Sequence, residues 1–322
     1  MNVLVTGGAG YIGSHACKAL ALAKHRPITY DNLSHGHDWA VKWGPLERGD
    51  IGDTARLVDV IQRHRIEAVM HFAALCYVGE SVEKPDLYYQ NNVLGSLSLL
   101  NALKQTGVKP IVFSSTCATY GLPARVPIDE SFPQNPVNPY GNTKLCVERM
   151  LGDFDRAYGI SSISLRYFNA AGADPDGEIG EAHEPETHLI PSAVEAALGK
   201  RSRLTIMGAD YPTPDGTCVR DYIHVTDLAS AHVLALESLR AGKPSTAYNL
   251  GNGVGFSNYQ VVHELERIAG RKVPVEVGAR RPGDPPILVA DSSKAKKDLG
   301  WKPRHNDLAT IIETAWRWAQ RG

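Results

Sequence analysis

The sequence predicts an α/β protein built on a doubly wound parallel sheet. Predicted strands and helices alternate through the first half of the chain. The strands are continuous apolar runs, such as Ala68-Val69-Met70 and Ile111-Val112-Phe113. Unbroken runs indicate strands that are buried on both faces, which is typical of a parallel sheet covered by helices. A glycine-rich turn between the first strand and the first helix supports the same fold class.

The predicted elements follow in a regular order. In the first half we expect strands at 2–6, 27–31, 67–72, 110–115 and 161–168, and helices at 11–23, 53–64, 84–106 and 139–158. In the second half we expect helices at 189–199, 225–240, 257–269 and 306–319, and strands at 203–207, 246–250, 273–277 and 286–290. The start of the 139–158 helix is marked by Asn138, which can cap it, and by Pro139, which suits the first helical position.

The composition of the sequence and the length of the predicted elements change near residue 169. We expect one domain over residues 1–168 and a smaller, irregular α/β lobe over 169–322, with about 222–250 returning to extend the first sheet. The stretch 172–186 is rich in Gly, Pro, Asp and Glu and is expected to be a solvated acidic loop. Its ligand spacing does not fit an EF-hand, so we expect no metal there.

The composition argues against several classes of protein. The chain has 322 residues, with 34 Lys and Arg against 35 Asp and Glu, so neither nucleic acid nor a membrane is an expected partner. No apolar run reaches the roughly 18 residues that span a bilayer, and no charged segment of a secretory signal precedes the first strand. The five cysteines are scattered and form no C-x-x-C pair, which suits a reducing cytoplasm.

The glycine-rich turn is the first candidate binding element. It runs Gly7-Gly8-Ala9-Gly10-Tyr11-Ile12-Gly13, between a buried strand and an amphipathic helix. Glycines there permit a tight turn and let a pyrophosphate approach the backbone at the helix N-terminus. Asp31 ends the second strand, where an acid can bond the adenosine ribose hydroxyls and repel a 2′-phosphate. The glycine-rich turn and Asp31 together predict dinucleotide binding, with NAD favoured over NADP.

A second candidate element is the motif Tyr140-x-x-x-Lys144. The bare motif is weak, but here it stands at the start of a predicted helix, with the two side chains one turn apart on one face. A neighbouring ammonium and the positive charge of bound NAD would favour the phenolate, which makes Tyr140 a feasible general base. The preceding strand ends Ser114-Ser115-Thr116, where doubly wound sheets place their ligands. Thr116 or Ser114 could bond the reacting oxygen.

Together these motifs resemble the extended short-chain dehydrogenase/reductase superfamily, and further strings resemble its UDP-glucose 4-epimerase family. The most specific strings are Arg166-Tyr-Phe-Asn169, Asp215-Gly-Thr-Cys-Val-Arg-Asp-Tyr-Ile-His224 and Arg280-Arg-Pro-Gly-Asp284. The resemblance covers essentially the whole chain. It implies a Rossmann domain that holds NAD tightly, a lobe that binds the nucleotide sugar, and 4-epimerisation of a UDP-hexose through a transient 4-keto sugar.

The resemblance also implies roles for individual residues. Catalysis is expected from Tyr140, Lys144 and Thr116. The cofactor-binding residues are expected to be Gly7, Gly10, Tyr11, Ile12, Gly13, Asp31, Asn32, Asp50, Ile51, Phe72, Ala73, Ala74, Asn91, Ser114, Tyr140, Lys144 and Tyr167. The substrate-binding residues are expected to be Thr116, Tyr140, Phe168, Asn169, His188, Leu189, Thr205, Met207, Arg220, Arg281, Asp284 and Leu288. No metal is implied.

Three positions depart from the pattern of some family members. Cys76 stands where some epimerases have Lys, and His188 where an Asn often precedes the Leu. Leu288 stands where some have a Tyr that narrows the sugar pocket. We therefore expect efficient use of UDP-glucose and UDP-galactose, and weaker use of UDP-N-acetylglucosamine.

Other functions were weighed against this one. Nucleotide-sugar 4,6-dehydratases carry Asp-Glu after the Thr, and related decarboxylases carry Glu, whereas this chain has Cys117 and Ala118. A UDP-pentose 4-epimerase stays open, because the substrates differ by one CH2OH group. A non-catalytic NAD sensor would be expected to lack Tyr140 or Lys144. The family resemblance further implies a homodimer, with an apolar stripe of Leu94, Leu97 and Leu100 on one of its helices.

Overall fold

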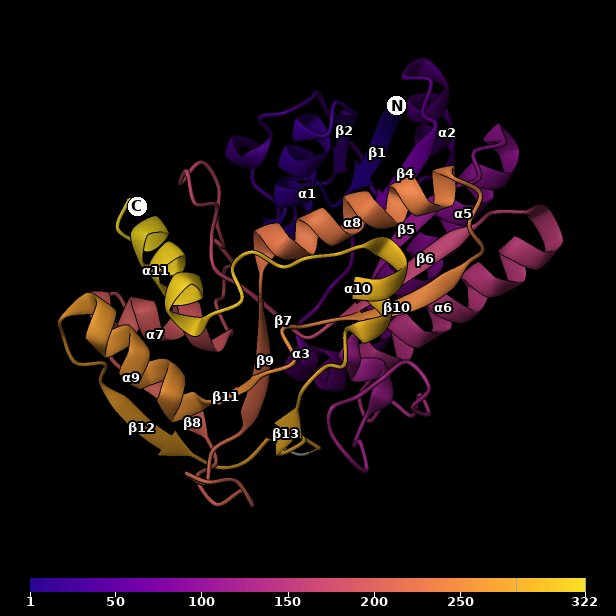
Figure 1. Cartoon of the computed structure of the whole chain (residues 1–322). Helices are drawn as coiled ribbons and strands as arrows, with labels where there is room; N and C mark the ends of the chain where they lie inside the picture. The colour runs from indigo at the N-terminus through magenta and orange to yellow at the C-terminus, as the bar shows by residue number, and fades with distance from the viewer. Residues whose placement is uncertain (282, 322) are drawn as a thin grey trace.

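The centre of the protein is a parallel sheet, described here from a computed structural model that covers residues 1–281 and 283–321. Pro282, within the Arg280–Asp284 string, lies outside the described residues. The seven strands have the order β10-β6-β5-β4-β1-β2-β3, and every pairing is parallel (Figure 1). They are β1 (Asn2–Thr6), β2 (Arg26–Asp31), β3 (Leu46–Arg48), β4 (Ala68–His71), β5 (Ile111–Thr116), β6 (Ser162–Tyr167) and β10 (Thr246–Leu250). The predicted fold class is confirmed.

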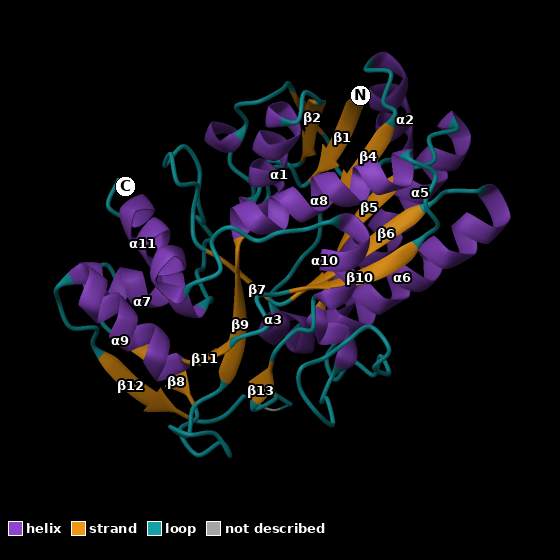
Figure 2. Cartoon of the chain, in the orientation of Figure 1, coloured by secondary structure: helices purple, strands orange, loops and turns teal. Residues whose placement is uncertain are grey.

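Helices cover both faces of this sheet (Figure 2). On one face, α1 (Tyr11–Leu22) and α8 (Val225–Arg240) pack on the strand residues Val3 and Val5. On the other face, α2 (Thr54–Arg63), α5 (Gly95–Thr106) and α6 (Pro139–Tyr158) pack on Leu4 and Ile28. Alternate residues of each strand therefore enter two different apolar cores, which explains why the strands are apolar without interruption.

The predicted helix over 84–106 is the least regular part of this layer. It consists of α4 (Pro85–Tyr88), a π-helical segment η2 (Tyr89–Leu94) and α5, and it is preceded by α3 (Val78–Glu83), which the prediction missed. Helix α3 has one buried residue, Ser81, so its sequence lacks the apolar face that marks a helix. The expected stripe is also wrong in part, because Leu100 is 1% exposed and belongs to the core, while Leu94 is 56% exposed.

The remaining elements form a smaller lobe, seen at the lower left of Figure 1. Strand β9 (Val219–His224), which the prediction missed, pairs with β7 (Asn169–Ala171), β11 (Gly255–Ser257) and β13 (Ile287–Leu288). Strands β8 (Leu204–Met207) and β12 (Val275–Gly278) form a separate parallel pair. Helices α7 (Leu189–Leu198), α9 (Asn258–Ala269) and α11 (Leu308–Ala319) enclose the lobe's apolar core.

The chain returns to the large sheet after the lobe has begun. Strand β10 pairs with β6, and α8 packs against α1, with α10 (Ser293–Leu299) beside β10. Residues 222–224 instead belong to β9 of the small sheet. Short 3-10 turns complete the elements at η1 (Asp38–Ala40) and η3 (Cys117–Tyr120).

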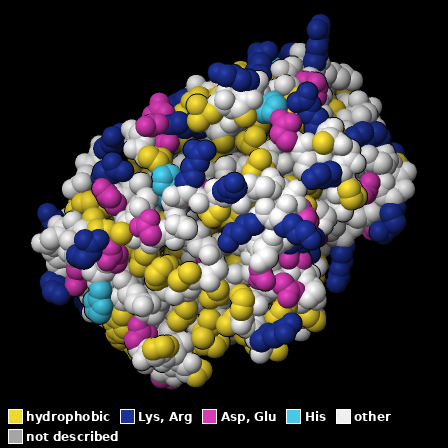
Figure 3. All heavy atoms as spheres, in the orientation of Figure 1, with side chains coloured by type: hydrophobic (Ala, Val, Ile, Leu, Met, Phe, Trp, Pro, Cys, Tyr) yellow, Lys and Arg dark blue, Asp and Glu magenta, His cyan; other side chains and the backbone are white. Residues whose placement is uncertain are grey.

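The surface carries charges of both signs. On the face shown in Figure 3, Lys and Arg side chains are interspersed with Asp and Glu, and hydrophobic side chains gather in the lower part of the view. Within the described residues, none of the helices combines the length and the apolar character needed to cross a membrane.

Candidate active site

A cleft of about 1030 Å³ opens between the carboxyl ends of the sheet strands and the lobe. Of the residues predicted for the site, 27 line this cleft. They are Gly7, Gly10, Tyr11, Ile12, Gly13, Asp31, Asn32, Ile51, Phe72, Ala73, Ala74, Asn91, Ser114, Thr116, Tyr140, Lys144, Tyr167, Phe168, Asn169, His188, Leu189, Thr205, Met207, Arg220, Arg281, Asp284 and Leu288.

Asp50 is the predicted site residue that does not line the cleft. It is exposed at the rim, where its carboxylate accepts hydrogen bonds from Asn32 Nδ2 at 2.8 Å and from the Gly52 amide at 2.8 Å. Asp50 follows the short strand β3, which the prediction missed, and its sequence does not show that the carboxylate folds back onto its own loop. Asp50 therefore holds Asn32 in place at the rim.

The glycine-rich turn is packed too tightly for side chains. Gly7 has φ +73°, and a Cβ there would lie 2.6 Å from the Ala73 amide nitrogen. A Cβ on Gly13 would lie 2.1 Å from the Gly7 carbonyl oxygen. The turn thus brings β1, β4 and the start of α1 together, and the first N–H groups of α1 have no partner within the helix.

Asp31 is held rigidly at the end of β2. Its carboxylate accepts hydrogen bonds from the amides of Ala9, at 3.0 Å, and Leu33, at 2.8 Å. The side chain is buried beside the glycine-rich turn, and burial raises its pKa above the usual value. The arrangement fixes one acidic group at the same end of the cleft as the N-terminus of α1.

Tyr140 and Lys144 stand on the first turns of α6. Asn138 caps this helix by accepting a hydrogen bond from the Gly141 amide at 2.8 Å, as its sequence predicts. The Lys144 ammonium donates to the Ser114 carbonyl at 2.9 Å and lies 5.9 Å from the centre of the Tyr140 ring. The Thr116 side chain, at the end of β5, lies beside Tyr140 and lines the same cleft. Three chemically active groups therefore meet at the carboxyl end of the sheet.

Burial dominates the ionisation of this pair. It raises the pKa of Tyr140 well above its ordinary value, and it lowers the pKa of Lys144 to about 8. The neighbouring Thr116 side chain works in the opposite direction on the pKa of Tyr140, but its effect is smaller. The prediction for the phenolate combined the Lys144 ammonium with the positive charge of bound NAD, so it stays a prediction for the protein with that group bound.

The lobe supplies the opposite wall. Arg220 on β9 pairs with Asp284 at 2.5 Å and donates to the Val219 carbonyl, and its side chain is largely buried. Leu288 on β13 is in register with Arg220 and packs against the small cluster that contains Phe168. Arg281 is exposed at the cleft edge. Among the described residues, this wall therefore presents the Arg220 guanidinium, fixed by an ion pair, and the exposed guanidinium of Arg281.

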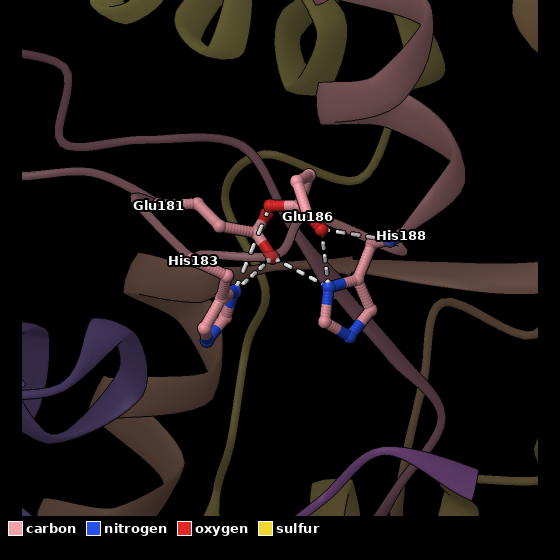
Figure 4. Close-up of side chains that lie close together, drawn as sticks. All are labelled: Glu181, His183, Glu186 and His188. Carbon is pink, nitrogen blue, oxygen red and sulfur yellow. Dashed lines mark hydrogen bonds and ion pairs between the residues drawn. The ribbon is translucent and has the colours of Figure 1, made fainter. Parts of the chain in front are cut away.

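The loop 172–186 differs from its prediction. Glu181 and Glu186 are 8% and 4% exposed, and each pairs with His183 and His188, so part of this loop is buried rather than solvated (Figure 4). The interpretation missed Glu181, His183 and Glu186. The sequence contains two Glu-x-His units of identical spacing, and this repetition could have indicated that the four side chains lie together.

The prediction also missed two side chains that shape the cleft. Asn92 bonds both the amide and the carbonyl of Leu75, at 2.8 and 3.0 Å. The Tyr88 hydroxyl bonds the amide and carbonyl of Tyr77, at 2.9 and 2.8 Å. Both residues therefore hold the segment 75–77 at the cleft, although neither lines it.

Several known proteins are similar to this chain in sequence and in structure. The NAD dependent epimerase/dehydratase family matches residues 3–251. A UDP-glucose 4-epimerase of Rhizobium meliloti (strain 1021) is 54% identical over 99% of this chain and 97% of its own. The crystal structure of UDP-glucose 4-epimerase from Brucella ovis in complex with NAD is 56% identical, with a TM-score of 0.96 over 98% of this chain and 97% of its own. One from Stenotrophomonas maltophila, with bound NAD and formylated UDP-arabinopyranose, is 42% identical, with a TM-score of 0.96 over 100% of this chain and 98% of its own. The chain belongs to the NAD dependent epimerase/dehydratase family and, within it, to the UDP-glucose 4-epimerases.

Proposed function

We propose that this chain interconverts UDP-glucose and UDP-galactose by 4-epimerisation, with NAD as a tightly bound cofactor and no net redox change. The observation that carries the proposal is the meeting of Tyr140, Lys144 and Thr116 in a cleft whose other wall holds Arg220. The high identity to UDP-glucose 4-epimerases over nearly the whole chain supports the same reaction. The reaction would place the enzyme in galactose metabolism.

The residues present fit NAD. The glycine-rich turn leaves backbone rather than side chains at the cleft wall, and the unpaired N–H groups of α1 are suited to a pyrophosphate. We infer that Asp31 would bind the adenosine ribose and Lys144 the nicotinamide ribose, since both line the cleft. We infer that the domain over 1–168, with the returning segment 225–250 that forms α8 and β10, holds NAD, and that the rest of 169–322 holds the nucleotide sugar.

When bound, NAD would supply reversible oxidation and reduction at C4 of the sugar. Tyr140 removes the proton of the O4 hydroxyl as a general base and later returns it, while Thr116 bonds the same oxygen. Lys144 lies close enough to stabilise the phenolate. Because the 4-keto sugar has to present either face, the site must hold UDP firmly and the hexose loosely. Arg220 and Arg281 are suited to the first task, since guanidinium groups bind phosphates with charge-assisted hydrogen bonds.

A UDP-pentose is a second candidate substrate. The Stenotrophomonas maltophila neighbour holds formylated UDP-arabinopyranose, whose sugar is a pentose. The test is to incubate the protein separately with UDP-glucose, UDP-galactose, UDP-xylose and UDP-N-acetylglucosamine and to resolve the products by chromatography. Galactose and glucose products support the proposal. If only UDP-xylose is turned over, the substrate is a UDP-pentose and not a UDP-hexose. If there is neither turnover nor NADH absorbance, the result favours a non-catalytic NAD sensor.

We also propose that the protein is a cytoplasmic homodimer. All five cysteines are free, which suits a reducing compartment. Exposed apolar side chains gather on the α3–α4–η2 segment beside α6, namely Val78, Val82, Leu87, Tyr89 and Leu94. A contact between two copies would cover them. Light scattering at micromolar concentration should give twice the 35.0 kDa chain mass, and a monomer mass would reject the dimer.

A further inference from the structure

The loop that precedes α7 carries two identical Glu-x-His units, Glu181-Ala-His183 and Glu186-Thr-His188. The fold brings all four side chains to one point in the wall of the cleft (Figure 4). One ligand-capable atom from each lies within 4.8 Å of every other. Both imidazole rings direct Nδ1 toward the carboxylates, so the four groups face a common centre.

Four nitrogen–oxygen distances within this cluster lie close to the separation between ligands of a four-coordinate cation. His183 Nδ1 lies 3.0 Å from Glu181 Oε1 and 3.7 Å from Glu186 Oε2. His188 Nδ1 lies 3.0 Å from Glu181 Oε1 and 2.9 Å from Glu186 Oε1. Ligands of a tetrahedral Zn²⁺ at bond lengths of about 2.0–2.1 Å are separated by roughly 3.3 Å. The four measured separations lie on both sides of that value.

The charges of the cluster also call for a cation. Glu181 and Glu186 are buried carboxylates, and buried charges are expected to be paired or to bind a metal. Two protonated imidazoles supply two positive charges, and so does one divalent metal ion between neutral imidazoles. The nearby cluster of Asp174, Asp176 and Glu178 differs, because the Lys18 ammonium lies within 2.8 Å of all three carboxylates.

We propose that Glu181, His183, Glu186 and His188 form a binding site for one divalent transition-metal cation. Two imidazole nitrogens and two carboxylate oxygens favour Zn²⁺ among the common metals. A site with four protein ligands is closed and therefore structural. It would fasten the loop to the start of α7 and so fix one wall of the cleft, whichever sugar the enzyme takes.

Protons are the competitors of the metal at this site. Imidazole nitrogens and carboxylate oxygens bind a metal only when they are deprotonated, so metal binding releases protons into solvent, and this release can be measured. Other titratable groups around the cluster are Tyr11, Tyr77 and Cys76.

The test is calorimetric titration of the chelator-treated, NAD-containing protein with ZnCl2, in two buffers of different ionisation heat. We expect one Zn²⁺ per chain, with net release of protons. Glu181→Gln and His183→Gln should each weaken binding by more than the roughly 10–100-fold that loss of an outer-shell partner costs. Asp176→Asn is the matched control, because it removes a nearby carboxylate that pairs with Lys18 and lies outside the proposed site, and it should leave binding unchanged.

The free thiol near the cluster needs its own control. Cys76→Ser should bind Zn²⁺ like the wild type, and Co²⁺ should give four-coordinate visible absorption without a thiolate charge-transfer band. The proposal is overturned if the wild type shows no saturable binding, if both ligand variants bind as well as the wild type, or if Cys76→Ser abolishes binding. The wild-type titration decides even where a variant fails to fold. None of these readouts uses turnover, so they are independent of the proposed function.

Discussion

The two walls of the cleft are built in different ways. The sheet wall consists of side chains at the ends of parallel strands, such as Asp31 on β2 and Thr116 on β5, and most residues of these two strands are buried. The lobe wall is assembled by contacts between distant segments, such as Arg220 with Asp284, which are 64 residues apart. We infer that the first wall performs the chemistry and the second sets substrate affinity and choice.

The sharpest test of this division is Tyr140→Phe. Removal of the phenolic hydroxyl should lower kcat by about 10²–10⁴-fold, the usual cost of losing a general base. The NAD content should stay unchanged, because the glycine-rich turn and Asp31 are untouched. Turnover within a few-fold of the wild type would remove Tyr140 from the mechanism and break the comparison.

The sheet wall could be predicted from the sequence because its determinants are local. Asn138 and Pro139 indicate the start of α6. Tyr140 and Lys144 then follow, one helical turn apart on one face. Likewise Gly7, Gly10 and Gly13 act within a single turn between one strand and one helix. Backbone hydrogen bonds fix such groups relative to one another, so their spacing in the sequence carries their geometry.

The lobe wall could be predicted only through family resemblance, and in part not at all. Nothing local indicates that Glu181 and Glu186 are buried, because their burial depends on His183 and His188 turning toward them. Strand β9 escaped notice because it carries the charged pair Arg220 and Asp221 within an apolar run. Asp221 is buried there and accepts hydrogen bonds from the amides of Asn252, Gly253 and Ala290.

On the lobe wall, Arg220→Lys should raise KM for UDP-glucose while kcat changes little. An ammonium cannot reproduce the planar fork of donors, and one lost charge-assisted hydrogen bond of about 1.5–3 kcal/mol corresponds to roughly 10–100-fold in affinity. Arg280→Lys is the matched control, since Arg280 pairs with Asp210 and stacks on Tyr211 away from the cleft lining. A fall in kcat at constant KM would show that Arg220 takes part in the chemical step, which contradicts the division of roles between the two walls.

Leu288→Tyr tests the choice of sugar on the same wall. A phenol ring in place of Leu288 should narrow the pocket, and a methylene-sized change discriminates substrates by about 1–3 kcal/mol. We expect kcat/KM for UDP-N-acetylglucosamine to fall by at least roughly fivefold relative to UDP-glucose. Leu288→Met, which conserves volume, should keep the wild-type ratio. An unchanged ratio in Leu288→Tyr would show that Leu288 does not set the pocket.

The smallest expected effect is on the free energy of unfolding, which the buried Lys144 of the sheet wall lowers. Burial lowers the pKa of Lys144 to about 8 in the folded, cofactor-free protein, against an unfolded value of 10.5. Between these two values the unfolded chain binds more protons, so the contribution of Lys144 to the free energy of unfolding rises with pH, by roughly 1 kcal/mol per pH unit. Below pH 8 both states are protonated, and the full penalty for burying the ammonium is present.

The measurement is urea unfolding of the cofactor-free wild type and Lys144→Met at pH 7.5 and 9.5. Groups other than Lys144 titrate in both proteins and cancel in the difference. We expect Lys144→Met to have the advantage at pH 7.5, because a buried charge is replaced by an apolar side chain of similar length, and to lose part of it at pH 9.5. Equal differences at the two pH values would mean that the Lys144 ammonium is well solvated in the folded chain. The sheet wall would then have no stored electrostatic penalty for a bound cofactor to relieve, and Lys144 would owe its position to the Ser114 carbonyl alone.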